Sequence, residues 1–388
     1  MRIAERFEVL SRHDGGMASV FVCRDSEGGR LVAAKTPRAA PDWFSREARL
    51  WIGLGNHPNI VRADLVHTED DCRFLFMEFV GELDGRPRTL SRVLEERGKM
   101  SLEQALRVGI DIARALRHAR SVFPDLVHRD IKPDNIMVRD NGQSALADFG
   151  IGHVPKEVLQ AWTEQGAPRV IEGTTVAAEG ACGTLPYASP EQMAGCPGDL
   201  RSDLHALGMV LLECLVGRFA HDAWRTNLPS GAVPGPAVVP AFEPKTNGER
   251  ALAGLIGRLI DSNPERRPSG LDEVEKALSS IAAREGAEVP EVPEHRDELT
   301  APVWASRIHS LSVLGKPELA LENIQQMQRR YPWSDEFVEI ARELHVPPMD
   351  IVRRDLGSLS RVLLLGTTWL ACVGVCLGLM GALEGSRL

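Results

Sequence analysis

The feature that most constrains the fold of this chain is a series of three short motifs in a fixed order. The first, Val32–Lys35, ends in a lysine; the second, His128–Asn135, reads His-Arg-Asp-Ile-Lys-Pro-Asp-Asn; the third, Asp148–Gly150, reads Asp-Phe-Gly. One such tripeptide alone is a weak signal. An ordered set at these separations is much harder to obtain by chance, so we expect the three motifs to belong to one domain.

The hydropathy pattern divides this domain into a β-rich and a helical part. Residues 1–80 are predicted to form short strands around one helix, Pro41–Leu54. The β-rich runs are Phe7–Leu10, Ser19–Cys23, Leu31–Lys35, Val61–His67 and Arg73–Val80. Helical spacing dominates residues 100–282, in Leu102–Arg120, Ser202–Val216, Arg250–Ile260 and Leu271–Ala283. Strands followed by helices indicate an α+β fold.

The composition excludes several classes of protein. A chain of 388 residues is long enough for two or three domains at about 150 residues each. With 45 Lys and Arg against 54 Asp and Glu, the net charge is −9, and nucleic acid is not an expected partner, because nucleic-acid binders neutralise phosphates with cations. The 7 cysteines are scattered and odd in number, which indicates a reducing cytosolic setting rather than a disulfide framework or a zinc site.

Two further segments follow the domain. Residues 283–300 form an acidic, proline-containing linker. Residues 301–348 are predicted to be helical, with helices at Pro302–Leu314 and Pro317–Arg330 and a third beginning near Ser334. The favoured positions of one tetratricopeptide unit are matched by Trp304, Leu311, Gly315, Ala320, Ile324, Met327 and Pro332. A plain helical hairpin explains the pattern equally well.

The end of the chain has the pattern of a membrane anchor. Residues 362–383 contain no charged residue, and at about 1.5 Å per residue such a helix crosses a hydrocarbon core of about 30 Å. A buried core helix is the alternative. The preceding juxtamembrane segment, residues 349–361, is basic, so the positive-inside bias places the domain in the cytoplasm and residues 384–388 outside as a short tail.

Small residues recur inside this apolar segment. Gly374, Gly378 and Ala382 are four residues apart, and small residues at that spacing allow two helices in a membrane to approach closely. A homodimer in the membrane is therefore a hypothesis.

Together with Gly15–Phe21 and Gly183–Gln192, the three motifs resemble the bacterial eukaryotic-like (Hanks-type) serine/threonine protein kinases. The resemblance covers about residues 5–282. It implies a bilobal kinase fold, with an N-lobe at about residues 1–80 and a C-lobe at about residues 81–282. It also implies transfer of the γ-phosphoryl group of ATP to Ser or Thr of proteins, the chain itself included, with Mg²⁺ or alternatively Mn²⁺.

The resemblance assigns the catalytic roles residue by residue. Lys35 would hold the α- and β-phosphates and would pair with Glu47 on the following helix. Asp130 would orient the substrate hydroxyl and accept its proton, and Lys132 would neutralise charge on the γ-phosphoryl group.

Two further residues would hold the metal ion. Asn135 and Asp148 supply an amide oxygen and a carboxylate, and Mg²⁺ prefers oxygen ligands.

The expected nucleotide site departs from the family pattern GxGxxGxV in one loop. His13 and Ala18 stand where glycines are usual, although Gly15 and Gly16 still allow the backbone to approach a phosphate. Around the adenine ring, the resemblance implies backbone contacts from Glu78 and Val80. Met77 would be the gatekeeper, and the side chains that would sandwich the ring are Val20, Ala33 and Met137.

The segment between Asp148 and Glu191 would be the activation segment. Thr184 resembles the specificity marker of serine/threonine-directed kinases. Because Arg129 precedes the catalytic Asp130, a phosphorylated threonine could pair with it, and we expect autophosphorylation at one of two neighbouring positions. These positions are Thr174 and Thr175.

Two scaffold interactions are expected in the C-lobe. Glu191 should form a buried ion pair with Arg267, and Asp203 should bind the backbone of the catalytic loop.

Two other functions stay open at this stage. A catalytically weak or inactive membrane-anchored scaffold is suggested by His13 and Ala18. A small-molecule phosphotransferase would share Asp130 and Asn135 but usually lacks the Asp-Phe-Gly and Ser-Pro-Glu arrangement. The expected partners are protein substrates, the membrane, a second copy of the chain and a protein bound by the helical segment.

Overall fold

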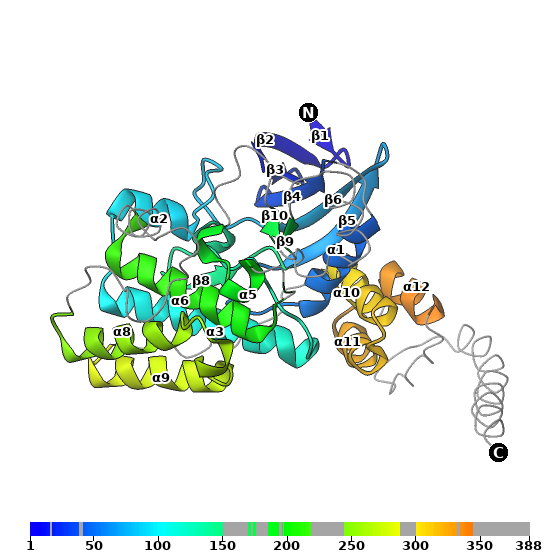
Figure 1. Ribbon diagram of the computed structural model, residues 1–388. Coiled ribbons are helices and arrows are strands. Elements are labelled where there is room, and N and C mark those ends of the chain that lie inside the picture. The colour runs from blue at the N-terminus through cyan, green and yellow to red at the C-terminus, as the bar shows by residue number, and fades with distance from the viewer. Residues whose placement is uncertain are drawn as a thin grey trace, which may run out of the picture. The chain divides into compact units, whose positions relative to one another are not determined.

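The computed structural model of the chain describes both lobes and the helices that follow them (Figure 1). The described residues are 1–15, 18–38, 42–149, 170–171, 174–175, 185–193, 196, 198–218, 244–287, 300–331 and 334–343. The chain divides into two compact units, Met1–Asn323 and Ile324–Leu388.

A six-stranded antiparallel sheet forms the first part of the chain, with strand order β1-β2-β3-β4-β6-β5. Its strands are β1 (Arg2–Ile3), β2 (Phe7–Asp14), β3 (Ala18–Asp25), β4 (Leu31–Pro37), β5 (Ala63–Glu69) and β6 (Cys72–Glu78). Successive side chains of a strand point to opposite faces. One face packs an apolar core of Ile3, Phe21, Cys23, Val32, Ala34, Phe74 and Phe76.

The register of the sheet places four of the predicted site residues on its other face. Val20 lies opposite Lys35, and Ala33 lies opposite Met77. All four alternate with the core residues of the same strands. The lysine and the expected adenine-binding side chains therefore share one face.

Helix α1 (Asp42–Leu54) connects β4 to β5 and contacts β5, α3 (Leu102–Val122) and α10 (Ala301–Val313). Its last turns are buried on all sides, with Trp51 and Ile52 only 3% and 2% exposed. A helix that is apolar all round needs neighbours all round. Gly55 ends the helix at φ +71°, a conformation that favours glycine.

Among its described residues, the second lobe contains four long helices: α3, α6 (Leu200–Val216), α8 (Asn247–Leu259) and α9 (Leu271–Arg284). Helix α6 is buried over most of its length and contacts α3 and α8, while α9 packs against α3 and α8 (Figure 1). Capping boxes begin α3 and α8, so their first backbone N–H groups are satisfied locally.

The described part of this lobe also contains shorter elements, several of which flank the predicted site residues. These are α2 (Leu90–Arg97), the 3₁₀ turn η1 (Pro133–Asn135), β7 (Ile136–Val138), β8 (Ser144–Leu146), β9 (Val170–Ile171), β10 (Thr174–Thr175), η3 (Leu185–Tyr187), α5 (Pro190–Met193) and η5 (Pro264–Arg266).

Helices α10, α11 (Pro317–Arg330) and α12 (Asp335–Glu343) follow the second lobe. They lie where the sequence predicts helices. Across the described part of the chain, no helix combines the length and the apolar character needed to cross a membrane. The predicted span, residues 362–383, and the segments on either side of it lie outside the described residues.

The predicted two-lobed α+β architecture, a β-sheet lobe followed by a helical lobe, is confirmed. The sheet differs from the prediction at one edge. Strand β1 was not expected, because two residues, Arg2 and Ile3, are too few to show alternation; they pair with Phe7 and Glu8 of β2. Strand β2 also continues to Asp14, opposite Ser19 of β3.

Candidate active site

Lys35 of β4 reaches the segment after β8. Its ammonium donates a hydrogen bond to the carboxylate of Asp148. Burial lowers the pKa of Lys35, but the carboxylates of Asp148 and Glu47 outweigh this effect and the pKa is raised above its usual value. Burial likewise raises the pKa of Asp148, yet Lys35 holds it below its usual value. Both groups are therefore charged at neutral pH.

Glu47 of α1 is close to this pair without joining it. The side chain is 6% exposed, and within the described residues its Oε1 has no hydrogen-bond partner. Burial raises the pKa of Glu47 to about 8, against the opposing charge of Lys35. Among the described residues the predicted Lys35–Glu47 ion pair is not present: the ammonium of Lys35 bonds to Asp148, and Oε1 of Glu47 has no hydrogen-bond partner.

The second motif forms a compact loop around Asp130, which is 5% exposed. The Nζ of Lys132 donates to Oδ2 of Asp130 at 2.8 Å, and Nδ2 of Asn135 donates to the same oxygen at 2.9 Å. Burial raises the pKa of Asp130 to about 6, and Lys132 and Asn135 limit the rise. Asp130 is thus mostly ionised at pH 7 and still basic enough to accept a proton.

Asn135 stands between Asp130 and the third motif. Its side-chain NH₂ also donates to the backbone carbonyl of Asp130 at 2.8 Å, and the backbone carbonyl of Asn135 accepts from the N–H of Ala147 at 2.8 Å. The NH₂ group is therefore committed, which leaves the side-chain oxygen as the acceptor. With the ionised carboxylate of Asp148, this donor set suits a hard cation such as Mg²⁺.

Asp203 of α6 holds the backbone of the catalytic loop, as expected. Its two carboxylate oxygens accept the N–H groups of His128 and Arg129 at 2.8 and 2.7 Å. Burial raises the pKa of Asp203 to about 6, and these two hydrogen bonds oppose the rise. Arg129 adopts φ +64° in the anchored turn, and Asp148 adopts φ +68°. Two L-residues in this costly region near one site indicate a geometry imposed by their surroundings.

His128 connects the second and third motifs, a role that the sequence analysis missed. Its Nε2 lies 3.0 Å from the carbonyl of Ala147, and its ring packs edge-on against Phe149 with centroids 4.8 Å apart. Burial lowers the pKa of His128 to about 4, so the ring is neutral at pH 7. Its place in the His-Arg-Asp motif was the available signal.

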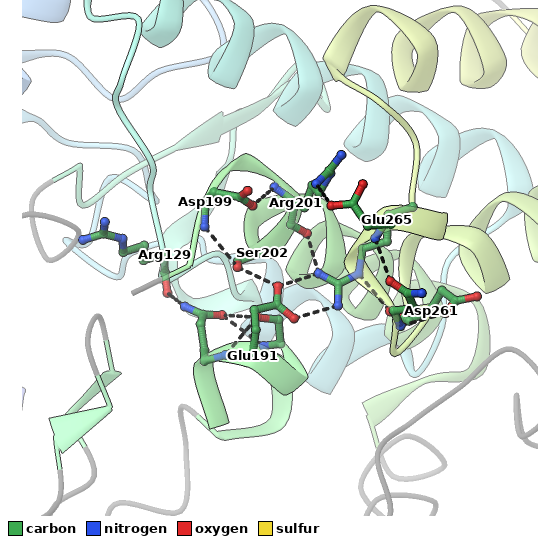
Figure 2. Close-up of polar contacts among 11 residues, drawn as sticks. Arg129, Glu191, Asp199, Arg201, Ser202, Asp261 and Glu265 are labelled. Atoms are coloured by element: carbon green, nitrogen blue, oxygen red, sulfur yellow. Dashed lines mark hydrogen bonds and ion pairs between the residues drawn. The ribbon is translucent and has the colours of Figure 1, made fainter. Parts of the chain in front are cut away.

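The Glu191–Arg267 pair is present and bidentate (Figure 2). Nη1 and Nη2 of Arg267 donate to the two oxygens of Glu191 at 2.6 and 2.8 Å, and Nη1 also donates to the carbonyl of Arg201. Ser202 donates to Glu191 as well. Burial tends to raise the pKa of Glu191, but these hydrogen bonds hold it at about 2.

Figure 2 also shows how this cluster reaches the catalytic loop. Next to Glu191, the side-chain Nε2 of Gln192 donates to the carbonyl of Arg129 at 3.3 Å. Gln192 was not among the site residues predicted from the sequence. Through this bond, the short helix α5 and the catalytic loop are joined.

Glu78, at the end of β6, forms an ion pair across the two lobes. Nη1 and Nη2 of Arg139 donate to its two oxygens at 2.9 and 2.7 Å, and the N–H of Arg62 donates to one of them at 2.8 Å. Burial raises the pKa of Glu78, but Arg139 turns the net shift downward. The expected adenine contact used only the backbone of Glu78, so this side-chain pair is a finding of the structure.

Most of the remaining predicted residues lie in described elements or next to them, and two lie outside the described residues. Met77 and Val80 are buried at the end of β6 and just after it, and Met137 lies on β7. The N–H of Gly15 donates to the carbonyl of Ala18 at 2.9 Å, which closes the loop between β2 and β3. Thr174 and Thr175 form strand β10. Gly16 and Thr184 lie outside the described residues.

Comparison with known proteins agrees with this geometry. The protein kinase domain family matches residues 13–280. The chain is 32% identical to a probable serine/threonine-protein kinase of Clostridium perfringens, over 55% of this chain and 29% of that protein. It is 34% identical to the serine/threonine-protein kinase PrkC of Bacillus subtilis, over 57% of this chain and 32% of PrkC. A probable serine/threonine-protein kinase of Streptomyces coelicolor is 32% identical over 70% of this chain and 39% of that protein. The matches thus span about a third of the length of these relatives.

Proposed function

Because the chain belongs to the protein kinase domain family, we propose that it transfers the γ-phosphoryl group of ATP to Ser or Thr side chains of proteins, including its own. The observation that carries the proposal is the cluster of Asp130, Lys132 and Asn135 beside the Lys35–Asp148 pair. Phosphoryl transfer needs a positioned hydroxyl, a proton acceptor and cations around the phosphates. The cluster contains a group for each requirement.

In this mechanism Asp130 accepts the proton of the substrate hydroxyl while the hydroxyl oxygen attacks the γ-phosphorus, and the bond from the γ-phosphorus to the bridging oxygen breaks as ADP leaves. Its pKa of about 6 leaves it ionised at pH 7. Lys132, already 2.8 Å from Asp130, lies where it can neutralise the charge of the transferred group. Lys35 would hold the α- and β-phosphates once its ammonium exchanges Asp148 for phosphate oxygens.

Asp148 and Asn135 would hold a divalent cation, Mg²⁺ or Mn²⁺, which would neutralise phosphate charge when bound. The fit rests on the ionised state of Asp148 and on the committed NH₂ of Asn135. Adenine would lie near Val20, Ala33, Met77 and Met137, against the backbone of Glu78 and Val80.

Protein Ser and Thr residues are proposed as substrates on two grounds. The relatives named above are serine/threonine-protein kinases or probable ones, and the sequence carries Thr184 and the Ser189–Glu191 stretch. Autophosphorylation at Thr174 or Thr175 would place a phosphate on the activation segment, where Arg129 could pair with it.

The remaining parts of the proposal rest on the sequence. We propose that residues 362–383 anchor the chain in a membrane with the kinase domain on the cytoplasmic side, and that two such spans associate through Gly374, Gly378 and Ala382. The helical segment 301–348 would bind a protein partner. Membrane fractionation of the full chain, compared with a variant in which Gly374 and Gly378 are replaced by arginine, tests the anchor: the variant should leave the membrane fraction.

A catalytically weak scaffold is the second candidate, because among the described residues Oε1 of Glu47 has no hydrogen-bond partner, and because His13 stands in the glycine-rich loop. The deciding experiment is autophosphorylation with radiolabelled ATP. Wild type should incorporate label into Ser or Thr, and Lys35→Met should not. Absence of label in wild type, with ATP still bound, would favour the scaffold.

A further inference from the structure

Helix α10 lies beyond the residues that match the kinase family, yet it packs on the kinase domain. The family match ends at residue 280, and α10 spans Ala301–Val313. The helix contacts α1 and β5. Four apolar side chains of α10 are almost fully buried: Val303, Trp304, Ile308 and Leu311. Their spacing places them along one side of the helix.

The contact is close because α1 offers glycines at the points of approach. A Cβ on Gly53 would lie 3.5 Å from Cδ2 of Leu311, and a Cβ on Gly55 would lie 2.1 Å from Cζ of Arg307. The guanidinium of Arg307 therefore occupies the space that any side chain at position 55 would need. Gly55 and Ala63 also line one narrow gap with Val303 and Arg307.

A second anchor lies at the far end of the same segment. The ammonium of Lys316 is 5.7 Å from the centroid of the Phe123 ring, at the end of α3. Phe123 in turn lies against Gly53, at 3.0 Å from the position of a Cβ there. Residues 301–316 thus contact α1 directly through α10 and indirectly through Phe123.

What α10 holds is the helix that carries Glu47. Glu47 precedes Gly55 by eight residues, which is about 12 Å along one continuous helix. Since a packed helix moves as a unit, a hold on its last turns sets the position of its middle. In the seated arrangement Lys35 bonds to Asp148, and Oε1 of Glu47 is buried without a partner among the described residues.

We propose that α10 is a positioning element of the phosphoryl-transfer site: seated on α1 and β5, it holds α1 where Glu47 and Lys35 do not pair, and its release lets them pair. Trp304 and Arg307 are then positioning residues that act through Glu47. The proposal rests on the proposed function, because an effect on turnover requires the chain to be a kinase.

The first test compares turnover of full-length variants, per folded molecule. Trp304→Ala removes the largest buried side chain of α10, and Val313→Ala removes one that is 51% exposed on the same helix. Weakening the packing of α10 on α1 by Trp304→Ala should raise kcat by between about 2-fold and 30-fold. Val313→Ala should leave kcat unchanged. Arg307→Ala, which keeps the apolar contact, should show a smaller rise. An unchanged or lower kcat in folded Trp304→Ala overturns the proposal.

The second test asks whether the gain runs through Glu47. Glu47→Gln cannot form the ion pair, so Trp304→Ala should give no rise in kcat when combined with Glu47→Gln. A helix that only stabilises the fold would not produce this dependence. A gain that persists in the double variant overturns the proposal.

The third test needs no turnover, so it separates failure of the inference from failure of the proposed function. A carbodiimide activates a carboxyl group, a neighbouring amine displaces it to form an amide, and the carbodiimide leaves as a urea that carries the carboxyl oxygen. Peptide mass spectrometry then identifies the two partners. Wild type should yield the Lys35–Asp148 crosslink, and Trp304→Ala should shift it toward Lys35–Glu47. An unchanged ratio overturns the role of α10 even if every variant is an active kinase. A shift supports it even if none is.

Discussion

The two halves of the site differ in how firmly their charged groups are held. In the catalytic loop, Asp130 is contacted by Lys132 and Asn135, and Asp203 fixes the backbone beside it. On α1, Glu47 is about as buried, but its Oε1 has no hydrogen-bond partner within the part of the chain that the structure describes. Partnered buried groups fix one geometry, whereas an unpartnered buried carboxyl is costly and favours any rearrangement that pairs it. The catalytic loop is therefore the preset half of the site, with one fixed geometry. The α1 side is the adjustable half, which can change position.

The largest effect is expected from Asp130→Asn, which removes the proton acceptor and keeps the loop's shape. Transfer should fall by about 10²–10⁴-fold, the usual contribution of a positioned base, while ATP binding stays close to that of wild type. Turnover and nucleotide affinity measured on the same preparation check this.

Asp134→Asn is the matched control, because Asp134 is exposed in the same loop and should leave turnover unchanged. If Asp130→Asn kept the wild-type rate, the assignment of the base would be wrong, and so would the description of this half as preset for chemistry.

Breaking the buried Glu191–Arg267 ion pair should have the next largest effect. Arg267→Met leaves Glu191 without its bidentate partner and should lower the free energy of unfolding by about 3–5 kcal/mol. Urea denaturation measures this. Adding Glu191→Gln to Arg267→Met should recover part of the loss, because the uncompensated charge is gone. A loss in the free energy of unfolding of less than about 1 kcal/mol would show that the Glu191–Arg267 pair does not stabilise the preset half.

Glu47→Gln should change the pH dependence of stability. The pKa of Glu47 rises from 4.5 to about 8 on folding, so the folded state keeps a proton that the unfolded state releases. Stability conferred by this proton is full below about pH 4.5 and is lost as pH rises toward 8. Glu47→Gln lacks that loss and should be more stable than wild type at pH 8, with little difference at pH 4.

Unfolding midpoints at the two pH values measure this difference. Equal midpoints for wild type and Glu47→Gln at pH 8 would mean that Glu47 is paired in solution, and the contrast between the two halves would disappear.

The smallest expected effect is a shift in the pH profile. Turnover should fall as pH drops through about 6, where Asp130 takes up a proton. Lys132 lowers the pKa of Asp130, so Lys132→Met should move this acidic limb to higher pH as well as reduce the rate. The profile of kcat/KM against pH measures the shift. An unmoved limb would mean that another group controls it.

The sequence predicted the preset half better than the adjustable one, for a physical reason. Asp130, Lys132 and Asn135 are separated by a few residues, so the local turn brings them together once the motif is recognised. Asp203 and the Glu191–Arg267 pair are distant in sequence, but each belongs to a recognisable motif.

The arrangement around Glu47 could not be predicted from its motif. The position of α1 depends on α10, which lies about 250 residues later and beyond the kinase match. The Glu78–Arg139 pair was missed for a related reason. Its members are 61 residues apart, and no local pattern marks either one as a partner.

That pair has a consequence for movement. Glu78 ends the last strand of the first lobe, and Arg139 directly follows β7 of the second. A bidentate arginine–carboxylate pair fixes the mutual orientation of its partners as well as their distance. With the N–H of Arg62 on the same carboxylate, the pair ties the end of β6 to the residue after β7, so a relative motion of the two lobes must either break this pair or leave this joint in place.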